Sequence, residues 1–146
     1  MQLALDTNVV SELAKPDCNE QVFAWSQTLR SQDLFLPSPC WAELQRGVHL
    51  LPAGRRRDRI TASLESLIGS LGGIVAFGRA EAQIYAELTS QPGRPRPPID
   101  AMIAAICRTH ELALATRNTR DFDDCGIDLV SPWQYVSRSW DHAQTG

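Results

Sequence analysis

The sequence predicts a single α/β domain in which a parallel sheet is covered by helices on both faces. Short apolar runs alternate along the chain with longer segments whose apolar residues recur at helical spacing. The runs are apolar throughout, as in strands that are buried on both sides. The chain has 146 residues, 43% of them hydrophobic, and no internal repeat or second core is visible. We therefore assign residues 1–137 to one domain and residues 138–146 to a polar C-terminal tail.

Each predicted strand is a short apolar run that stops at a polar or turn-forming segment. The first run stops at Asp6, and the fourth stops at a polar loop, 117–125. The sheet is therefore expected to have four to five strands. In chain order the predicted strands are 2–5, 34–36, 74–77, 112–115 and 127–130.

The predicted helices are bounded by residues that favour helix ends. Asn19 can cap the second helix, Ser38-Pro39 suits the start of the third, and Gly72-Gly73 suits the end of the fourth. Pro16 ends the first helix because proline cannot continue it. In chain order the predicted helices are 9–14, 20–30, 38 to the break at 52–54, 55–71, 79–89 and 99–109.

The charge, the cysteine spacing and the hydropathy of the chain argue against several classes of protein. The net charge is −3, so no basic footprint for nucleic acid covers the whole chain, although thirteen of the fourteen basic residues are Arg. The four cysteines form no CxxC pair, which argues against a zinc site or a disulfide framework. No signal peptide or membrane-spanning run is visible. We expect a cytoplasmic protein that is not associated with a membrane.

Acidic and amide side chains follow several of the predicted strands. Asp6 comes directly after the first strand, and Asn118 and Asp121 follow the fourth. Asp100 lies in the first turn of a helix, and Glu43 lies on the helix that begins after the second strand. Singly, each has a simpler explanation as a turn, a helix-dipole or a surface residue. Parallel topology brings these segments to one sheet edge, and this convergence favours a functional site.

A cluster of carboxylates needs a positive partner, because like charges that lie close together repel and raise each other's pKa. Mg²⁺ prefers oxygen ligands and commonly takes one or two carboxylates together with a substrate phosphate. One such cation can activate water as the nucleophile, and a second can stabilise the leaving oxygen. The sequence therefore predicts a magnesium site that acts on a phosphodiester.

Five segments resemble, in order and spacing, the motifs of a PIN domain of the VapC toxin type. The similarity extends from Gln2 to about Trp133 and so covers nearly the whole chain. It implies a three-layer α/β/α fold with a central parallel sheet. The segments are Leu5–Leu13, Trp41–Gly47, Pro98–Ala105, Ala115–Phe122 and Val130–Trp133.

The resemblance also implies an activity and partners. It implies a metal-dependent endoribonuclease that hydrolyses RNA and uses Mg²⁺, with Mn²⁺ as the expected substitute. Such a toxin forms a homodimer and is silenced by a small VapB-type antitoxin, which forms a hetero-oligomer with it and whose tail covers the active site. By position, Asp6 and Asp100 correspond to the core metal ligands, and Glu43 to a third acid that binds the metal directly or through water.

The fourth motif departs from the pattern of some relatives. They place an Asp directly after Thr-Arg, where this sequence has Asn118. Asn118 offers a neutral oxygen, and Asp121 is the nearest replacement carboxylate, so either or both can complete the site. We expect the hydroxyls of Thr7 and Thr116 to support the ligands as a second shell. The reduced negative charge favours one cation, held by Asp6 and Asp100, as the resting state.

Two arginines are candidates for RNA binding, because Arg94 and Arg96 lie in the Pro-rich loop that leads to Asp100.

The main alternative is a catalytically weak PIN-like protein with a binding or regulatory role, which the neutral Asn118 supports. A receiver domain is excluded, because it needs an acidic pair after the first strand and a Lys after the fifth, and the only Lys is Lys15. A flap-type DNA nuclease is excluded because the chain has no room for its insertions.

Overall fold

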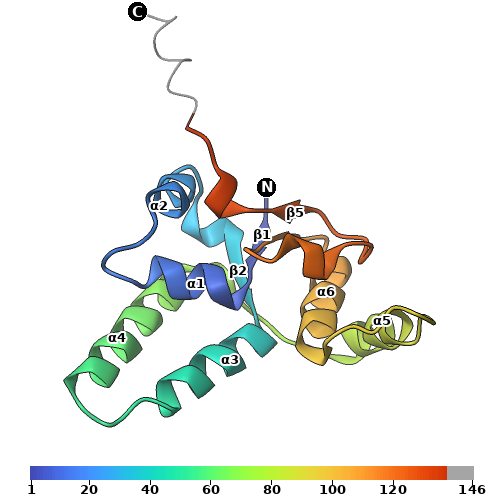
Figure 1. Cartoon of the computed structure of the whole chain (residues 1–146), viewed down its shortest axis with the longest axis horizontal. Coiled ribbons are helices and arrows are strands. Elements are labelled where there is room, and N and C mark those ends of the chain that lie inside the picture. Colours follow the sequence, from blue (N-terminus) through green and yellow to red (C-terminus); the bar gives the residue numbers. More distant parts are fainter. Residues whose placement is uncertain (138–146) are drawn as a thin grey trace, which may run out of the picture.

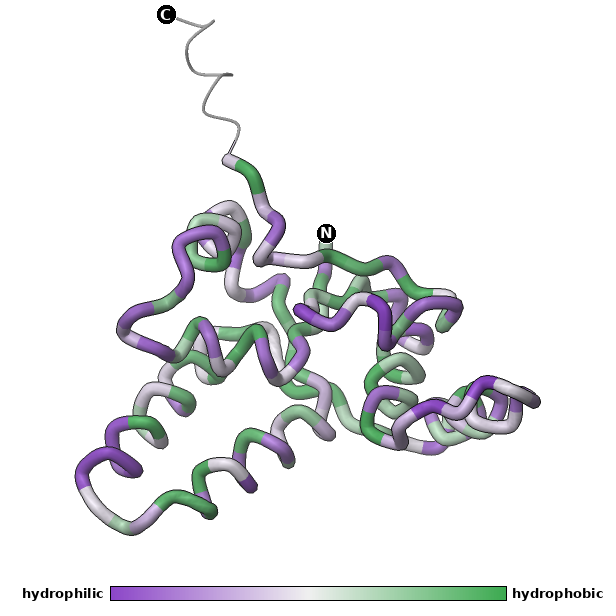
Figure 2. The backbone as a smooth tube through the Cα atoms, in the orientation of Figure 1, coloured by the Kyte–Doolittle hydropathy of each residue, from purple (hydrophilic) through white to green (hydrophobic). Residues whose placement is uncertain are grey.

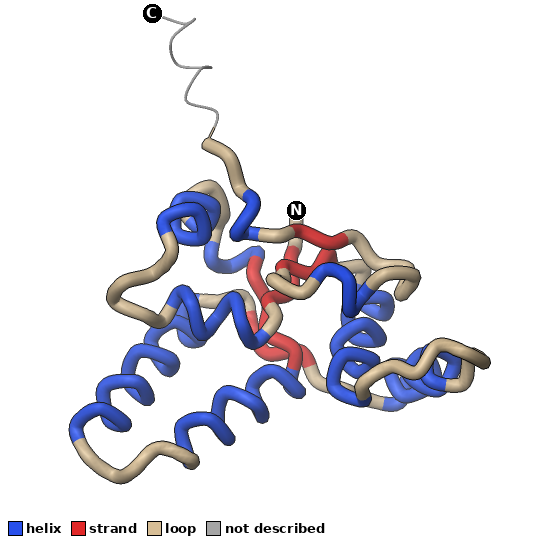
Figure 3. The backbone as a smooth tube through the Cα atoms, viewed as in Figure 1, coloured by secondary structure: helices blue, strands red, loops and turns tan. Residues whose placement is uncertain are grey.

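A computed structural model, which describes residues 1–137, has a five-stranded parallel sheet at its centre (Figure 3). The predicted tail, 138–146, lies outside the described residues. The order across the sheet is β3-β2-β1-β4-β5, and every neighbouring pair is parallel. The predicted four to five parallel strands are thus confirmed. The strands are β1 (Leu3–Leu5), β2 (Leu34–Pro37), β3 (Gly73–Val75), β4 (Ala113–Ala115) and β5 (Leu129–Val130).

Helices flank the sheet and make the three-layer α/β/α arrangement that the sequence predicted. Figure 1 shows α1 and α2 on one side of β1 and β2, and α6 with α5 on the other. The pair α3 and α4 forms a hairpin that extends away from the sheet. The helices are α1 (Thr7–Leu13), α2 (Glu20–Ser26), α3 (Ser38–His49), α4 (Arg55–Ser70), α5 (Arg79–Thr89) and α6 (Pro98–His110).

The hydrophobic core lies along β1, β4 and α6. These three elements are apolar along much of their length (Figure 2). All residues of β1 and β4 are buried, as expected for central strands of a sheet that is covered on both faces. Helix α6 is buried over 103–107, and it packs against α5. The most deeply buried large side chains include Leu3, Leu5, Leu36, Ile103, Ile106, Leu114 and Phe122.

The strand order places a topological switch point between β1 and β4. The chain leaves β1 toward β2 and β3 on one side, and later returns to β4 and β5 on the other. In such sheets, ligands bind beyond the carboxyl ends of the strands at the switch point. Asp6 follows β1 and Thr116 follows β4, and the Asp6 amide donates to the Ala115 carbonyl at 2.9 Å. The two strand ends therefore meet where the sequence predicted the acidic site.

Two helix boundaries differ from the prediction for identifiable reasons. Helix α1 begins at Thr7 rather than at residue 9, because the Asp6 carboxylate caps it directly. Helix α2 ends at Ser26 rather than at residue 30. The Ser26 and Thr28 hydroxyls donate to nearby backbone carbonyls at 2.7 Å, which favours a turn over further helix.

The edge strand β3 is shifted from the predicted 74–77 to Gly73–Val75. It pairs only with β2. The Phe77 amide donates to the Ser38 hydroxyl at 3.2 Å instead of to a strand, so the ladder ends before it. Strand β5 is likewise shorter than predicted, at Leu129–Val130. The prediction also missed three short 3-10 helices: η1 (Ser31–Asp33), η2 (Thr119–Phe122) and η3 (Pro132–Gln134).

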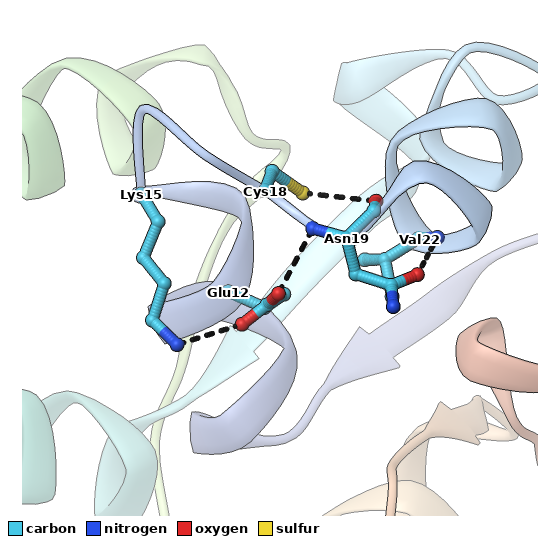
Figure 4. A network of polar contacts seen from close by, with 5 residues as sticks. All are labelled: Glu12, Lys15, Cys18, Asn19 and Val22. Atoms are coloured by element: carbon cyan, nitrogen blue, oxygen red, sulfur yellow. Dashed lines mark hydrogen bonds and ion pairs between the residues drawn. The ribbon is translucent and has the colours of Figure 1, made fainter.

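The connection between α1 and α2 is fixed by the carboxylate of Glu12 (Figure 4). One oxygen accepts from Lys15 Nζ and the other accepts from the Asn19 amide, both at 2.9 Å. Asn19 Oδ1 in turn caps α2 at the amides of Gln21 and Val22. The two helices are thereby held as a unit on one face of the sheet. Within residues 1–137, no helix is long and apolar enough to cross a membrane.

Candidate metal and nuclease site

Asp6 is the most buried acid of the site, with a side chain that ends β1 and caps α1. It retains 7% of its accessible surface, and its Oδ1 accepts from the Thr7 amide at 2.8 Å. The positive end of α1 favours a negative charge at this place. Burial nevertheless raises the pKa of Asp6, and the negative charge of Glu43 adds to the increase.

Side-chain donors surround the Asp6 carboxylate. Thr116 Oγ1 donates to Oδ2 at 2.7 Å, and Asn8 Nδ2 donates to the same oxygen at 3.4 Å. The Cys40 thiol makes a long contact of 3.9 Å with Oδ1. The bonds from Thr116 and the Thr7 amide stabilise the ionised form and oppose the effect of burial on the pKa. Asp6 is therefore fixed in orientation before any ligand arrives.

Glu43 projects from α3 toward the same place. Its Oε1 accepts from the Thr7 hydroxyl at 2.7 Å, so the residue that follows Asp6 also orients the second acid. Glu43 is exposed, whereas Cys40, one turn earlier on α3, is buried. Ligand atoms of Asp6, Cys40 and Glu43 all lie within 4.8 Å of one another. Two acids from distant segments are thus brought together as predicted.

Asp100 lies in the first turn of α6 and completes the acidic cluster. Its pKa is raised to about 6, first by burial and then by the charges of Asp6, Asp121 and Glu43. The charges of acids from three other segments thus act on Asp100 and disfavour its ionised form. Such a cluster attracts a cation strongly, because the cation relieves both the repulsion and the desolvation.

Asn118 and Asp121, the two candidates to complete the site, are connected to it in different ways. Asn118 is exposed, and its amide donates to Thr116 Oγ1 at 3.1 Å, so its backbone is tied to the site. Asp121, on η2, is also exposed, and its charge acts on Asp100. Thr116 is buried and joins Asn118 to Asp6. The structure thus connects Asn118 to the site through its backbone and Asp121 through its charge.

The donor set suits a hard divalent cation. Asp6, Glu43 and Asp100 offer carboxylate oxygens, which Mg²⁺ and Mn²⁺ prefer as ligands. The nearby sulfur of Cys40 is a soft donor, and burial raises the pKa of its thiol, which favours the protonated form while no metal is bound. The carboxylates outnumber this single thiol. The donor set is therefore richer in oxygen, the ligand that Mg²⁺ and Mn²⁺ prefer.

Sequence reasoning missed two side chains at the site. Asn8 bridges two segments, because it donates to Asp6 and its Oδ1 accepts from the Arg117 amide at 3.2 Å. Cys40 fills the space behind Asp6. The first could have been identified from its position two residues after Asp6. The second precedes Glu43 by three residues, the spacing that places two side chains on one helix face.

The two arginines that were predicted to bind RNA lie in the loop before α6 and contact the segment after η2. Arg94 forms an ion pair with Asp124, and both side chains are largely exposed. Arg96 donates to the carbonyls of Asp123 and Asp124 and to the sulfur of Cys125. Both arginines therefore have partners within the protein, and their role in RNA binding stays a prediction.

A groove of about 830 Å³ begins at the acidic cluster and runs between α1, α3 and α4. Thr7 and Glu43 line one part of it, and apolar residues of α3 and α4 line the rest. Basic side chains stand along it. The basic lining residues include Lys15, Arg56 and Arg59, and the apolar ones include Leu44, Val48 and Ile60.

Comparisons with known proteins agree with this geometry. A model of the PIN domain matches residues 3–127. The toxin FitB of Neisseria gonorrhoeae is 37% identical over 136 residues, which cover 90% of this chain and 98% of the relative. A VapC ribonuclease, Y4jK of Sinorhizobium fredii, is 34% identical over 137 residues, with 90% and 98% of the two chains covered.

A solved structure shows the same fold. The crystal structure of FitAcB from Neisseria gonorrhoeae contains a chain that superposes with a TM-score of 0.83 at 35% identity. The superposition covers 91% of this chain and 99% of the other. The likeness in fold therefore extends over most of both chains.

Proposed function

This chain belongs to the PIN-domain family, and on that basis we propose that it is a metal-dependent endoribonuclease, the toxin of a toxin–antitoxin pair. The observation that carries the proposal is the approach of Asp6 and Glu43 to one another beyond the end of β1, together with the effect of their charges on Asp100. The relatives support it, since one is named a toxin and another a VapC ribonuclease. The unit that acts comprises residues 1–137, and we place it in the cytoplasm, with RNA as its substrate.

The cation that we propose is Mg²⁺, with Mn²⁺ as a substitute. Asp6 and Asp100 are its ligands, and Glu43 binds it directly or through water. When bound, the cation supplies a Lewis acid that promotes attack of water on a phosphodiester. The chain's own contribution is to fix the ligands: Thr116 holds Asp6, and Thr7 holds Glu43. These two hydroxyls are proposed to orient the ligands without binding the cation themselves.

The remaining site residues act around this centre. Asn118 and Asp121 are the candidates to orient the attacking water or to complete the ligand set. Of the two arginines in the loop before α6, Arg94 is the candidate for contact with RNA phosphates, since the guanidinium of Arg96 is engaged with three residues of the protein itself. The exposed fraction of the Arg94 side chain, 55%, leaves it accessible to a polyanion despite its pairing with Asp124.

The partner that silences the enzyme is a VapB-type antitoxin, and the groove beside α3 suits its tail. An amphipathic segment could place apolar side chains on Leu44, Val48 and Ile60. Acidic side chains on the same segment would meet Arg56 and Arg59. A segment in this groove would also cover Glu43 and so block the site. We further propose that the toxin is a homodimer within the hetero-oligomer.

Cleavage of single-stranded RNA by the purified chain tests the enzymatic proposal. We expect cleavage with Mg²⁺ or Mn²⁺ and none after EDTA. Asp6→Asn and Asp100→Asn should each abolish it, because each removes a ligand charge. Thermal unfolding of both variants controls for loss of fold. Activity that survives EDTA, or that is unchanged in both variants, would contradict the mechanism.

A second candidate function is that of a PIN-like binding protein with weak catalysis. The neutral Asn118 in the fourth motif favours it. Induced expression in a bacterial host separates the two candidates. A toxin arrests growth, and the Asp6→Asn/Asp100→Asn variant does not. If both proteins arrest growth equally, the effect comes from binding rather than from cleavage.

A further inference from the structure

We propose that Arg96 is a positioning residue for the metal site, which holds the segment carrying Asp121 against the start of the helix carrying Asp100. The inference rests on the proposed function, since it concerns the same site. It assigns Arg96 a task within the protein that differs from contact with RNA.

Three contacts tie the Arg96 guanidinium to three consecutive residues. Nη1 donates to the Asp123 carbonyl at 3.2 Å and lies 2.9 Å from the sulfur of Cys125. Nη2 donates to the Asp124 carbonyl at 3.5 Å. The planar fork of arginine suits several acceptors at once, whereas an ammonium group has no such fork. Cys125 is buried, and so is the Nε atom of Arg96, which has no hydrogen-bond partner. The guanidinium is thus inserted into the segment rather than displayed on the surface.

The contacts of Arg96 join two segments, and each segment contains a proposed site residue. Arg96 precedes Asp100 by four residues, and prolines at 95, 97 and 98 restrict the backbone between them. Helix α6 begins at Pro98, with Pro97 at its N-cap, so Arg96 directly precedes the helix. At the other end, Asp123 follows Asp121 by two residues, directly after η2. A change in the Arg96 contacts therefore changes the distance between Asp100 and Asp121.

The connection opposes a repulsion that the site itself creates. Asp100 and Asp121 are carboxylates proposed for the same site, and two such like charges repel each other while no cation is bound. Arg96 binds backbone carbonyls and a sulfur, so it holds the segments together without occupying either carboxylate. Both carboxylates remain available to a cation. The arrangement prepares the ligand set before the cation arrives.

Arg94 provides a matched comparison in the same loop. It contacts the same segment through a single pair with the Asp124 side chain, and both partners are more than half exposed. Exposed pairs of this kind contribute little to stability, and Lys can replace Arg in them. Arg94→Lys is therefore the control: it makes the same substitution in the same loop, and the ion pair with Asp124 can still form.

The test is Mn²⁺ binding to the full chain by titration calorimetry without RNA. Arg96→Lys keeps the charge but loses the fork, and we expect it to weaken Mn²⁺ binding about tenfold or more. Arg94→Lys should change the affinity by less than about twofold. Hydrogen exchange of the amides of 119–125 should accelerate in the first variant alone. Unchanged Mn²⁺ affinity in a folded Arg96→Lys protein would overturn the proposal.

Two further outcomes keep the proposal distinct from its alternatives. If Arg96→Lys raises KM for RNA and leaves Mn²⁺ binding unchanged, Arg96 contacts RNA and the proposal is wrong. If the parent chain cleaves no RNA but Arg96→Lys still weakens Mn²⁺ binding, the proposal stands and the proposed function fails. Should Arg96→Lys not fold, Cys125→Ala removes one of the three contacts. It should then weaken Mn²⁺ binding about threefold, and no change would count against the proposal.

Discussion

Thr116 Oγ1 donates to Asp6 Oδ2 at 2.7 Å and so connects the ends of β4 and β1 across the switch point of the sheet. Both side chains are buried. The same hydroxyl oxygen accepts from the Asn118 amide at 3.1 Å. One side chain thus orients the most buried acid of the site and fixes the start of the loop that carries Asn118 and Asp121.

Removal of the Thr116 hydroxyl should weaken the site. Thr116→Val keeps the shape but leaves Asp6 without its shortest side-chain donor. We expect Mn²⁺ affinity to fall about 10- to 100-fold, because supporting residues of this kind orient ligands. The free energy of unfolding should fall by about 1–3 kcal/mol, because a buried charge loses a hydrogen bond. Calorimetric titration and urea denaturation measure both effects. Thr116→Ser should restore metal binding, and a Ser variant as weak as Val would show that the methyl group matters instead.

The raised pKa of Asp100 predicts how stability and metal binding depend on pH. The folded state holds the proton more tightly than the unfolded state, since the pKa rises from 3.8 to about 6. Without a cation, Asp100 therefore favours folding at pH 4, and this contribution is lost as pH rises through about 6. Urea denaturation in EDTA of wild type and Asp100→Asn isolates the effect by difference. The free energy of unfolding of Asp100→Asn minus that of wild type should be more positive at pH 7 than at pH 4.

Protons should also compete with the cation at Asp100. Below about pH 6, Mn²⁺ affinity should weaken by up to about tenfold per pH unit, because the ligand must lose its proton first. Titration calorimetry at pH 5, 6 and 7 measures this. An affinity that is constant from pH 5 to 7 would mean that Asp100 is not a ligand.

Two substitutions can show whether Asn118 or Asp121 completes the ligand set. Asp121→Asn removes a charge that acts on Asp100, and we expect it to weaken Mn²⁺ binding about tenfold. Asn118→Ala removes a neutral side chain, and we expect Mn²⁺ affinity within about twofold of wild type but slower RNA cleavage at saturating metal. The reverse order of the two affinities would identify Asn118 as the ligand.

Charge reversal in the groove should release the antitoxin. Arg56→Glu and Arg59→Glu change exposed residues of α4, so the fold should persist. Binding of an acidic antitoxin segment should weaken about tenfold or more, and the loss should shrink at high salt. Surface plasmon resonance with the cognate antitoxin measures this. Arg79→Glu, an exposed change at the start of α5, is the control. Equal losses in all three variants would point to net charge rather than to the groove.

The sequence predicted the elements of the fold well because their signals are local. Asn19 caps α2 as expected, and the apolar runs mark every strand to within a few residues. The order of the strands across the sheet was not predicted, since it depends on contacts between distant segments. The end of α2 was missed because the Ser26 and Thr28 hydroxyls compete locally with helical hydrogen bonds.

The acids of the site were predictable, but their environment was not. The position of Asp6 after a strand could be read from the sequence. The neighbours Asn8 and Cys40 were not predicted, because neither forms a recognisable motif by itself. The contacts of Arg96 depend on a segment about thirty residues away in sequence, which no local pattern reveals.

The glycine pair after α4 shows the same contrast between local and distant causes. Gly72-Gly73 was predicted to end the helix, but a Cβ on Gly72 would lie 2.4 Å from the Gln32 carbonyl and 2.8 Å from the Phe35 ring. We expect Gly72→Ala to destabilise the protein by about 1–3 kcal/mol, because backbone and core must shift. A Cβ on Gly69, within α4, would meet no atom of another segment within 4 Å, so Gly69→Ala should stabilise by about 0.5–1 kcal/mol. Urea denaturation compares the two. If Gly72→Ala matched Gly69→Ala, the close approach of β2 to this turn would not exist in solution.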